Sequence, residues 1–284
     1  MRVYFGSEFC EYLIPSKREL INAHEKSLSD GFDFTFVTPP VTDTGVEKLQ
    51  VLFEYLDSVE MEIEVVANDW GVVTLASRFE FLQPVMGRLL NKMLREPRFN
   101  TMYKNSEVPK APLKIFQNSG ISSNFMEIIK RYRIKRIELD NLYQGFGEDL
   151  NLHGLDASVY LPYGYIASGR MCYYAAVGRP TEVRFLYGRE CQKQCIGNSA
   201  TMVSEKTADL NNIIQKGNTV FYKQDKTMID KALQWIKNNR ARVVIFEDPI
   251  ELPAKAFENI EDAEACLSRT FENQRNIFSK SYEN

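Results

Sequence analysis

Hydrophobic residues follow two alternating patterns along the first third of the chain. Short apolar runs rich in β-branched and aromatic residues are typical of buried strands, and longer segments repeat apolar residues every three or four positions, as one helix face does. The runs predict strands at 2–6, 33–37, 62–67 and 83–87, and the segments predict helices at 16–28, 44–56 and 70–79. Ser16, with Glu19 three residues later, is a capping signal for the first helix. Strands separated by such helices indicate βαβ units and a parallel sheet.

The alternation returns after a proline-rich interval. Pro97, Pro109 and Pro112 mark residues 96–120 as a long excursion. Beyond it the pattern predicts helices at 123–132 and 227–239, and strands at 136–139, 150–163, 183–187, 219–222 and 243–246. Roughly eight to ten strands with intervening helices favour an α/β fold, a single (β/α) barrel domain over residues 1–253. Residues 254–284 predict a peripheral helix and tail.

Length and composition narrow the class of protein. The chain has 284 residues, of which 44% are hydrophobic and 26% charged, and these values exclude a disordered or fibrous protein. No apolar run approaches the roughly 20 residues that span a bilayer. Glu8 comes too early for the hydrophobic region of a signal peptide. We therefore expect a cytoplasmic protein with no membrane partner.

The distribution of charge leaves a local interaction open. A net charge of −3 argues against a generally basic nucleic-acid binder. Residues 88–136, however, contain twelve Lys and Arg against three Glu. This basic stretch could hold RNA phosphates or the acidic face of a partner protein, or its charges could simply be solvated.

Several common catalytic motifs are absent from the sequence. It contains no phosphate-binding Gly-x-x-x-x-Gly-Lys-Ser/Thr loop, no Gly-x-Ser-x-Gly turn and no His-Glu-x-x-His pair. There are only two histidines. His24 lies on the apolar face of the first predicted helix, where we expect it to be packed. His153 lies near a strand end, just before a predicted turn at Gly154, and could face the barrel mouth as an acid or base.

The cysteines carry the clearest chemical signal. There are five, an odd number without an export signal, so a disulfide framework is not expected. Cys191 and Cys195 have three residues between them, Cys172 lies 19 positions before Cys191, and Cys10 follows the first strand. In a parallel barrel the carboxyl ends of the strands share one face, which Cys10 and Cys172 can both reach. Four thiolates there would suit an iron–sulfur cluster or an all-cysteine zinc site, although isolated cysteines are often buried filler. Cys266 is predicted to be a half-buried helix residue.

The residues around these cysteines resemble the U32 peptidase family, the collagenase-like proteases. Ser168-Gly169-Arg170-Met171-Cys172, followed by Glu190-Cys191 and Cys195, is similar to the family's signature region, here numbered 164–200. Residues 3–10, 65–71 and 84–92 are similar to its upstream strand ends, so the likeness covers most of residues 1–200 in order. The spacer between Cys172 and Cys191 is longer than the family's, and the chain begins where its second barrel strand is expected.

The resemblance implies both a fold and a cofactor. It implies a TIM-barrel-like core, either incomplete or irregular, or else closed by the strand at 243–246. It also implies that Cys10, Cys172, Cys191 and Cys195 match the four cysteines that hold a 4Fe–4S cluster in several family branches. Zinc remains the alternative metal, because both metals accept four thiolates.

The resemblance also implies a function. The most similar branch is the short single-domain one of anaerobic ubiquinone biosynthesis, which works as paired proteins, and related branches hydroxylate RNA bases without oxygen. We therefore expect oxygen-independent hydroxylation, or a related redox modification, of a small molecule or RNA base. We also expect the chain to pair with a second family subunit as a heterodimer, or to associate with itself. The alternatives are a non-catalytic metal-bearing partner subunit and a U32-type peptidase, for which no nucleophile–histidine pair is evident.

Four further residues are candidates for contact with a substrate. Asn68 and Arg88 each follow a predicted strand, where barrel enzymes place functional groups, although Asn68 could instead cap a helix. Arg170, two residues before Cys172, could pair with an anionic substrate, with the charge of a cluster or with a structural partner. We expect Arg170, Arg88 and Asn68 to orient the substrate and His153 to act as an acid or base.

Overall fold

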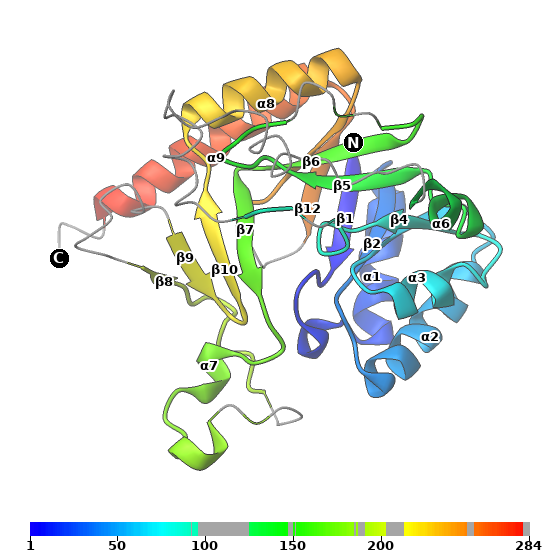
Figure 1. The fold of residues 1–284 in the computed structure, drawn as a ribbon, viewed down its shortest axis with the longest axis horizontal. Coiled ribbons are helices and arrows are strands. Elements are labelled where there is room, and N and C mark those ends of the chain that lie inside the picture. The colour runs from blue at the N-terminus through cyan, green and yellow to red at the C-terminus, as the bar shows by residue number, and fades with distance from the viewer. Residues whose placement is uncertain are drawn as a thin grey trace.

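Eight strands form a closed barrel with helices outside it (Figure 1). The computed structural model describes residues 1–91, 93–95, 125–146, 150, 152–184, 186, 191–202, 213–248 and 253–280. The strands follow the order β1-β12-β11-β6-β5-β4-β3-β2 around the barrel. Their bounds are β1 (Arg2–Gly6), β2 (Asp33–Thr38), β3 (Ile63–Ala67), β4 (Leu82–Met86), β5 (Arg136–Asp140), β6 (Asp156–Leu161), β11 (Arg242–Ile245) and β12 (Ala254–Phe257). The α/β barrel expected from the sequence is confirmed at this level.

The helices bury their apolar faces against the outside of the strands. They are α1 (Lys17–Ser29), α2 (Asp43–Asp57), α3 (Trp70–Ala76), α6 (Phe125–Arg131), α8 (Lys226–Asn239) and α9 (Ile260–Lys280). Ser16 caps α1, and the side chain of Glu19 accepts from the Ser16 backbone, so the predicted capping box is confirmed. α2 begins at Asp43, after its N-cap residue Thr42 and one residue before the expected start at 44. No helix in the described ranges is both long and apolar enough to cross a bilayer.

The barrel is closed by a strand that the sequence did not reveal. Neighbouring strands are parallel except for β12, which pairs antiparallel with both β1 and β11. The barrel therefore does not end at residue 253, because residues 254–257 complete its wall. The strand expected at 243–246 is present as β11 but reaches β1 only through β12. α9 packs beside this closure, with Cys266 buried at 6% exposure rather than half-buried.

A second, smaller sheet lies outside the barrel. It contains β7 (Tyr163–Ser168), β8 (Ala200–Thr201), β9 (Ile213–Lys216) and β10 (Thr219–Lys223), all antiparallel in the order β7-β10-β9-β8. β7 leads to the short helix α7 (Tyr173–Ala176), which projects away from the barrel (Figure 1). The segment at 164–200 is thus an addition to the barrel and not part of its wall.

Two other expectations about the middle of the chain have different outcomes. The β-rich stretch at 150–163 contains a turn at 153–154, then β6, and the first residue of β7. The strand expected at 183–187 is wrong for its described residues, because Thr181–Val183 forms a 3-10 helix, η2, and Arg184 a turn. The excursion expected at 96–120 lies outside the described residues.

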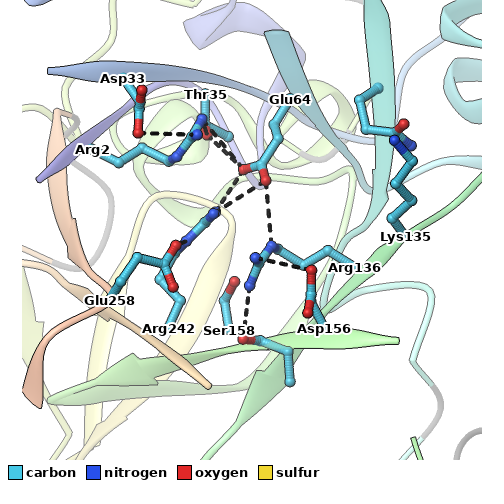
Figure 2. A network of polar contacts seen from close by, with 12 residues as sticks. Arg2, Asp33, Thr35, Glu64, Lys135, Arg136, Asp156, Ser158, Arg242 and Glu258 are labelled. Atoms are coloured by element: carbon cyan, nitrogen blue, oxygen red, sulfur yellow. Dashed lines mark hydrogen bonds and ion pairs between the residues drawn. The ribbon is translucent and has the colours of Figure 1, made fainter. Parts of the chain in front are cut away.

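The barrel interior has an apolar middle and a charged amino-terminal end. Tyr4, Val66 and Val244 are among the apolar residues that meet at its centre. At the amino ends of the strands, Glu64 on β3 accepts hydrogen bonds from Arg242 Nη1 and Nη2 at 2.6 and 3.2 Å (Figure 2). Arg136 and Arg2 also form ion pairs with the Glu64 carboxylate, at 3.3 and 3.6 Å, and Figure 2 shows both contacts.

Glu64 is the anion on which this charged layer depends. Burial would raise the pKa of Glu64, but the hydrogen bonds and charge of Arg242, with the charges of Arg2 and Arg136, lower it from 4.5 to about 2. Its ionised form is therefore favoured in the folded protein. Three arginines of the barrel share this one carboxylate, although Arg242 also pairs with Glu258 at 2.6 Å.

Replacing Glu64 should destabilise the fold strongly. Glu64→Gln leaves buried guanidinium groups without their shared counter-ion, and we expect the free energy of unfolding to fall by about 3–5 kcal/mol. Glu62→Gln, just before the same strand, is the matched control, because the Glu62 side chain is 69% exposed. Urea unfolding followed by circular dichroism measures both variants. Equal unfolding midpoints for the two variants would contradict this role for Glu64.

Glu138 on β5 responds to burial in the opposite direction. Burial raises the pKa of Glu138 from 4.5 to about 7, although the charges of Arg242 and Arg136 oppose the rise. One carboxyl oxygen accepts from the Tyr4 hydroxyl at 3.1 Å, and the other has no hydrogen-bond partner among the described residues. Near neutral pH this carboxyl is therefore partly protonated.

Glu138 should make the fold less stable in alkaline solution. Because its pKa is higher in the folded than in the unfolded chain, its stabilising contribution is complete below about pH 4.5 and is lost as the pH rises through 7. Glu138→Gln resembles the protonated acid, so the wild type should lose about 2–3 kcal/mol relative to this variant between pH 5 and pH 8. Urea unfolding at several pH values measures the difference, and parallel pH profiles would disprove the assignment.

Candidate functional site

The four cysteines singled out in the sequence come together in space. Cys10 follows β1 and Cys172 follows β7, whereas Cys191 and Cys195 lie between α7 and β8. Burial raises the pKa of Cys10 to about 12, and the thiols of Cys191, Cys172 and Cys195 add to this rise. Residues up to 185 positions apart in the chain are thus close enough to interact electrostatically. Cys266 on α9 is buried apart from this cysteine group.

Local backbone turns direct N–H groups at Cys10 and Cys172. Cys10 precedes the 3-10 helix η1 (Glu11–Leu13), and the backbone N–H of Tyr12 donates to its thiol. The Ser7 hydroxyl fixes this turn by donating to the Cys10 carbonyl at 2.8 Å. Cys172 precedes α7, and the backbone N–H groups of Tyr174 and Ala175 in this helix donate to the Cys172 thiol. Such donors favour the thiolate form that a metal binds.

The Cys191–Cys195 loop has the same kind of arrangement. The backbone N–H of Lys193 donates to Cys191 Sγ at 3.3 Å. Lys193 adopts a left-handed conformation with φ of +56°, which is uncommon for a residue with a side chain and is characteristic of functional loops. Burial raises the pKa of Cys195, as do the thiols of Cys172 and Cys191. Cys195 is the most deeply buried of the four.

The type and number of donors fit a metal–thiolate centre, whereas their spacing is not that of a ligated metal. Four thiols with N–H donors on three of them match the donor set of an iron–sulfur cluster or of an all-cysteine zinc site. Among the described residues, no three His, Cys, Asp or Glu side chains are placed so that they could hold a metal ion. The thiols would have to approach one another to bind one.

A cavity opens directly beside Cys10. It has a volume of about 190 Å³, and Phe9, Leu89 and Pro40 supply much of its apolar wall. Asn218, in the β9–β10 turn, holds the wall together by donating to the carbonyl oxygens of Phe9 and Gly169 at 2.7 and 2.6 Å. The cavity therefore lies where the first barrel loop meets the second sheet.

Arg170 lies at this cavity, as the sequence-based role required. Its side chain is exposed, and Nη2 lies 3.5 Å from the Val41 carbonyl oxygen, at the limit of a hydrogen bond. The cavity wall includes Arg170, Cys10 and Glu11. A guanidinium group and a thiol of the cysteine group thus border one small space.

Arg88, expected to orient a substrate, is instead buried at 1% exposure. Its guanidinium donates to both carboxylate oxygens of Glu8, at 2.8 and 2.6 Å, and to Asp140 at 2.6 Å. Asp140 is also bound by Arg95 at 2.8 Å, and the Arg88 guanidinium stacks 3.8 Å from the centroid of the Tyr160 ring. All its strong donors are engaged within the protein, so Arg88 closes the carboxyl end of the barrel.

Asn68 also has a structural position. Its side-chain amide donates to the Thr38 carbonyl at 3.0 Å, and its oxygen accepts from the Leu89 backbone at 3.1 Å. A Cβ atom at Gly87 would lie 2.2 Å from this oxygen, so glycine is needed for the amide to cross between the strand ends. Asn68 therefore positions the loop after β4 rather than a substrate.

Neither histidine lies with the cysteines. His24 is packed in the core, as expected, with Nδ1 3.3 Å from the Tyr55 hydroxyl, and burial lowers the pKa of its imidazole. His153 lies in the exposed turn before β6, at the amino end of that strand. Cys10 follows the carboxyl end of β1, so the structure does not bring His153 to the face where an acid or base was expected.

Several residues of this region escaped the sequence reasoning. Glu8 follows β1 and Asp140 ends β5. Their position at the ends of barrel strands is the sequence feature that could have identified them. Lys216 and Asp248 form a pair near Cys195, and nothing in the local sequence distinguishes them from solvated charges. Their contact depends on how the second sheet packs against the barrel.

No protein-family model matches the chain, and no curated protein matches it significantly. The likeness to the U32 peptidase family therefore rests on the motifs within residues 3–10, 65–71, 84–92 and 164–200. The chemistry of the site has to be inferred from the residues themselves.

Removing the charge of Arg88 should destabilise the protein as a whole. Arg88→Gln leaves the buried carboxylate of Glu8 without its partner and that of Asp140 with Arg95 alone, and we expect the free energy of unfolding to fall by about 3–5 kcal/mol. Arg78→Gln is the control, because Arg78 is exposed after α3 and its loss should change stability by no more than about 0.5 kcal/mol. Urea unfolding distinguishes the two. If Arg88→Gln were as stable as the wild type, the structural role of Arg88 would be contradicted and its expected role in substrate binding would be favoured again.

Proposed function

We propose that this chain is an iron–sulfur protein that holds a 4Fe–4S cluster through Cys10, Cys172, Cys191 and Cys195. In this proposal it takes part in oxygen-independent hydroxylation, or a related redox modification, of a small molecule or RNA base. One observation carries the proposal: among the four thiols implied by the family resemblance, those of Cys191, Cys172 and Cys195 lie near enough to Cys10 to raise its pKa. The barrel agrees with the TIM-barrel-like core that the same resemblance implies.

The residues of the chain have separable roles in this proposal. A bound cluster would supply single-electron transfer. The cysteines hold it, and the N–H groups near Cys10, Cys172 and Cys191 stabilise the bound sulfur atoms. Burial raises the pKa of Cys10, so its thiol must lose a proton on binding and the affinity for metal should rise with pH.

The cavity beside Cys10 is the proposed place for the substrate. Its apolar wall could hold the apolar part of a substrate, and Arg170 supplies a positive charge in the same wall for an anionic group. Arg88 and Asn68 support this place indirectly through Leu89 in the cavity wall. Leu89 follows Arg88 in the chain, and its backbone N–H donates to the side-chain oxygen of Asn68. His153 has no proposed part in catalysis.

A non-catalytic metal-bearing subunit, with a cluster or zinc, is the second candidate. Exposed apolar side chains gather in the cysteine-containing segment, at 49–75% exposure: Met171, Tyr173, Val177, Leu186, Ile196 and Met202. Apolar groups of this kind favour contact with another protein. A second family subunit or another copy of the chain would cover them, so metal binding and partner binding would occupy the same segment.

RNA binding through the basic stretch 88–136 has less support. Arg88 and Arg95 are buried in ion pairs with Asp140 and cannot reach phosphates. The Arg133 guanidinium donates to the carbonyl oxygens of Ser77 and Phe79 at 3.1 Å. Residues 96–124 lie outside the described part of the chain. A U32-type peptidase is not favoured either, because neither histidine accompanies a nucleophile at the cysteine group.

Metal analysis of the anaerobically purified protein tests the proposal. We expect absorption at roughly 400 nm and about four irons with matching sulfide per chain. Changing Cys10, Cys172, Cys191 or Cys195 to Ser should abolish or strongly reduce the bound iron. Cys266→Ser is the matched control and should retain it, because Cys266 is buried on α9.

The other outcomes separate the candidates. A colourless protein with about one zinc per chain, lost in the same four variants, would favour the metal-bearing subunit. Iron retained in any of the four variants would remove that cysteine from the ligand set. A protein that binds neither metal would overturn the proposed centre.

A further inference from the structure

The six most exposed large apolar side chains of the described residues all belong to one segment, 171–202. The segment leaves the second sheet after β7, and α7 within it projects away from the barrel (Figure 1). Single exposed apolar residues are common on protein surfaces, whereas their concentration in one projecting segment is typical of a contact site. We call these six residues the apolar lobe: Met171, Tyr173, Val177, Leu186, Ile196 and Met202.

The helix α7 is anchored on one side and apolar on the other. Ala176 is 2% exposed, and the Tyr174 hydroxyl donates to the Gln215 carbonyl oxygen on β9 at 3.0 Å. Tyr173 and Val177 are four positions apart, so they lie on the same side of the helical turn, and they are 67% and 75% exposed. The turn is thus packed through Ala176 and Tyr174, and it presents Tyr173 and Val177 outward.

The segment that carries the apolar lobe is basic, although the chain as a whole is acidic. Residues 170–202 contain five Lys and Arg against two Glu, a net charge of +3, whereas the whole chain carries −3. An opposite charge on a partner steers its approach and fixes its orientation, so a partner with an acidic surface fits this segment. The charged residues of the segment that the structure describes are Arg170, Arg179, Glu182, Arg184 and Lys193.

The residue types favour a protein over a lipid surface as the partner. Tyr, Met and Arg are enriched in protein–protein interfaces, where Lys is depleted, whereas membrane-binding surfaces favour Trp, Phe and Leu. The apolar lobe includes Tyr173, Met171 and Met202, and four of the five basic residues of 170–202 are Arg. Its composition is therefore that of a protein-binding surface.

We propose that the apolar lobe docks a protein whose contact surface has an apolar centre surrounded by Asp and Glu side chains. Tyr173 and Val177 enter the apolar centre, and Arg184 meets the acidic rim. Six side chains make a small contact, which is typical of a transient complex. The docking does not depend on a metal at the cysteine group, because no thiol takes part in it.

Photo-crosslinking from the apolar lobe tests the proposal in the cells that make the protein. A benzophenone side chain replaces Val177 in the full chain, ultraviolet light couples it to the molecule that lies against it, and mass spectrometry identifies the product. We expect one acidic protein to be coupled. The same side chain in place of Val51, which is 47% exposed on α2, is the matched control and should not couple that protein.

The coupled protein is then purified and titrated with the full chain. Val177→Ser should raise the dissociation constant about tenfold, because it removes an apolar group from the centre of the contact. Arg184→Glu should slow association and weaken its dependence on salt, because a rim charge acts mainly on the rate of encounter. Val51→Ser, and Lys231→Glu at an exposed position of α8, should bind as the wild type does.

The remaining outcomes overturn the proposal. Coupling of position 177 to a second copy of the chain would make the apolar lobe a self-association surface. Sedimentation with vesicles of phosphatidylcholine and phosphatidylserine, lost in Val177→Ser, would make it a lipid-binding surface. No product from position 177, the same product from position 51, or wild-type affinity in both lobe variants would leave no docking site there. Thermal unfolding is recorded for every variant, and if Val177→Ser does not fold, Arg184→Glu and the crosslink decide the outcome.

Discussion

The ion pairs of Arg88 inside the carboxyl end of the barrel are the contacts on which the site depends. Through Glu8 and Asp140 its guanidinium joins the loop after β1 to the end of β5. The Arg88 carbonyl also accepts from the Tyr165 hydroxyl on β7 at 3.2 Å, so the second sheet is tied to the same residue. Because Cys10 lies two positions after Glu8, these contacts fix where the first thiol stands relative to the rest of the cysteine group.

Charged side chains fill both ends of this barrel, around an apolar middle. Glu64 forms ion pairs with the arginines at the amino end, and Glu8 and Asp140 form ion pairs with Arg88 at the carboxyl end. Buried charges are tolerated only where each has a close partner, and removing one partner costs more than the pair contributes. Paired buried charges thus support the loops at the carboxyl end of the barrel.

The proposed site lies beside the carboxyl ends of barrel strands, because the cavity wall includes Phe9 after β1, Pro40 after β2 and Leu89 after β4. The cysteine group and the cavity lie where the loop after β1 meets the second sheet, and Asn218 and Tyr174 fasten that sheet around them. In the proposed function, the segment between β7 and β8 contributes three of the four ligands. The exposed apolar residues of the same segment would then place a partner close to the metal centre.

Local patterns along the sequence determined most of the strands and helices of the barrel. Period and capping revealed β1 to β5, and α1 with its Ser16 cap, because these depend on neighbouring residues. The spacing of the cysteines and their family likeness selected the four thiols that the structure brings near one another. The metal they hold stays a prediction.

Tertiary structure alone decided the closure of the barrel and the roles of its charged residues. β12 is a four-residue strand with little pattern of its own, and it exists because β1 and β11 flank it with unpaired edges. Arg88 and Asn68 look like ligand-binding residues at strand ends, but contacts with residues distant in sequence occupy them. Lys216 and Asp248 are 32 positions apart, and their pairing follows only from the packing of two sheets. Charge and residue type are written in the sequence, whereas burial and partnership arise when the chain folds.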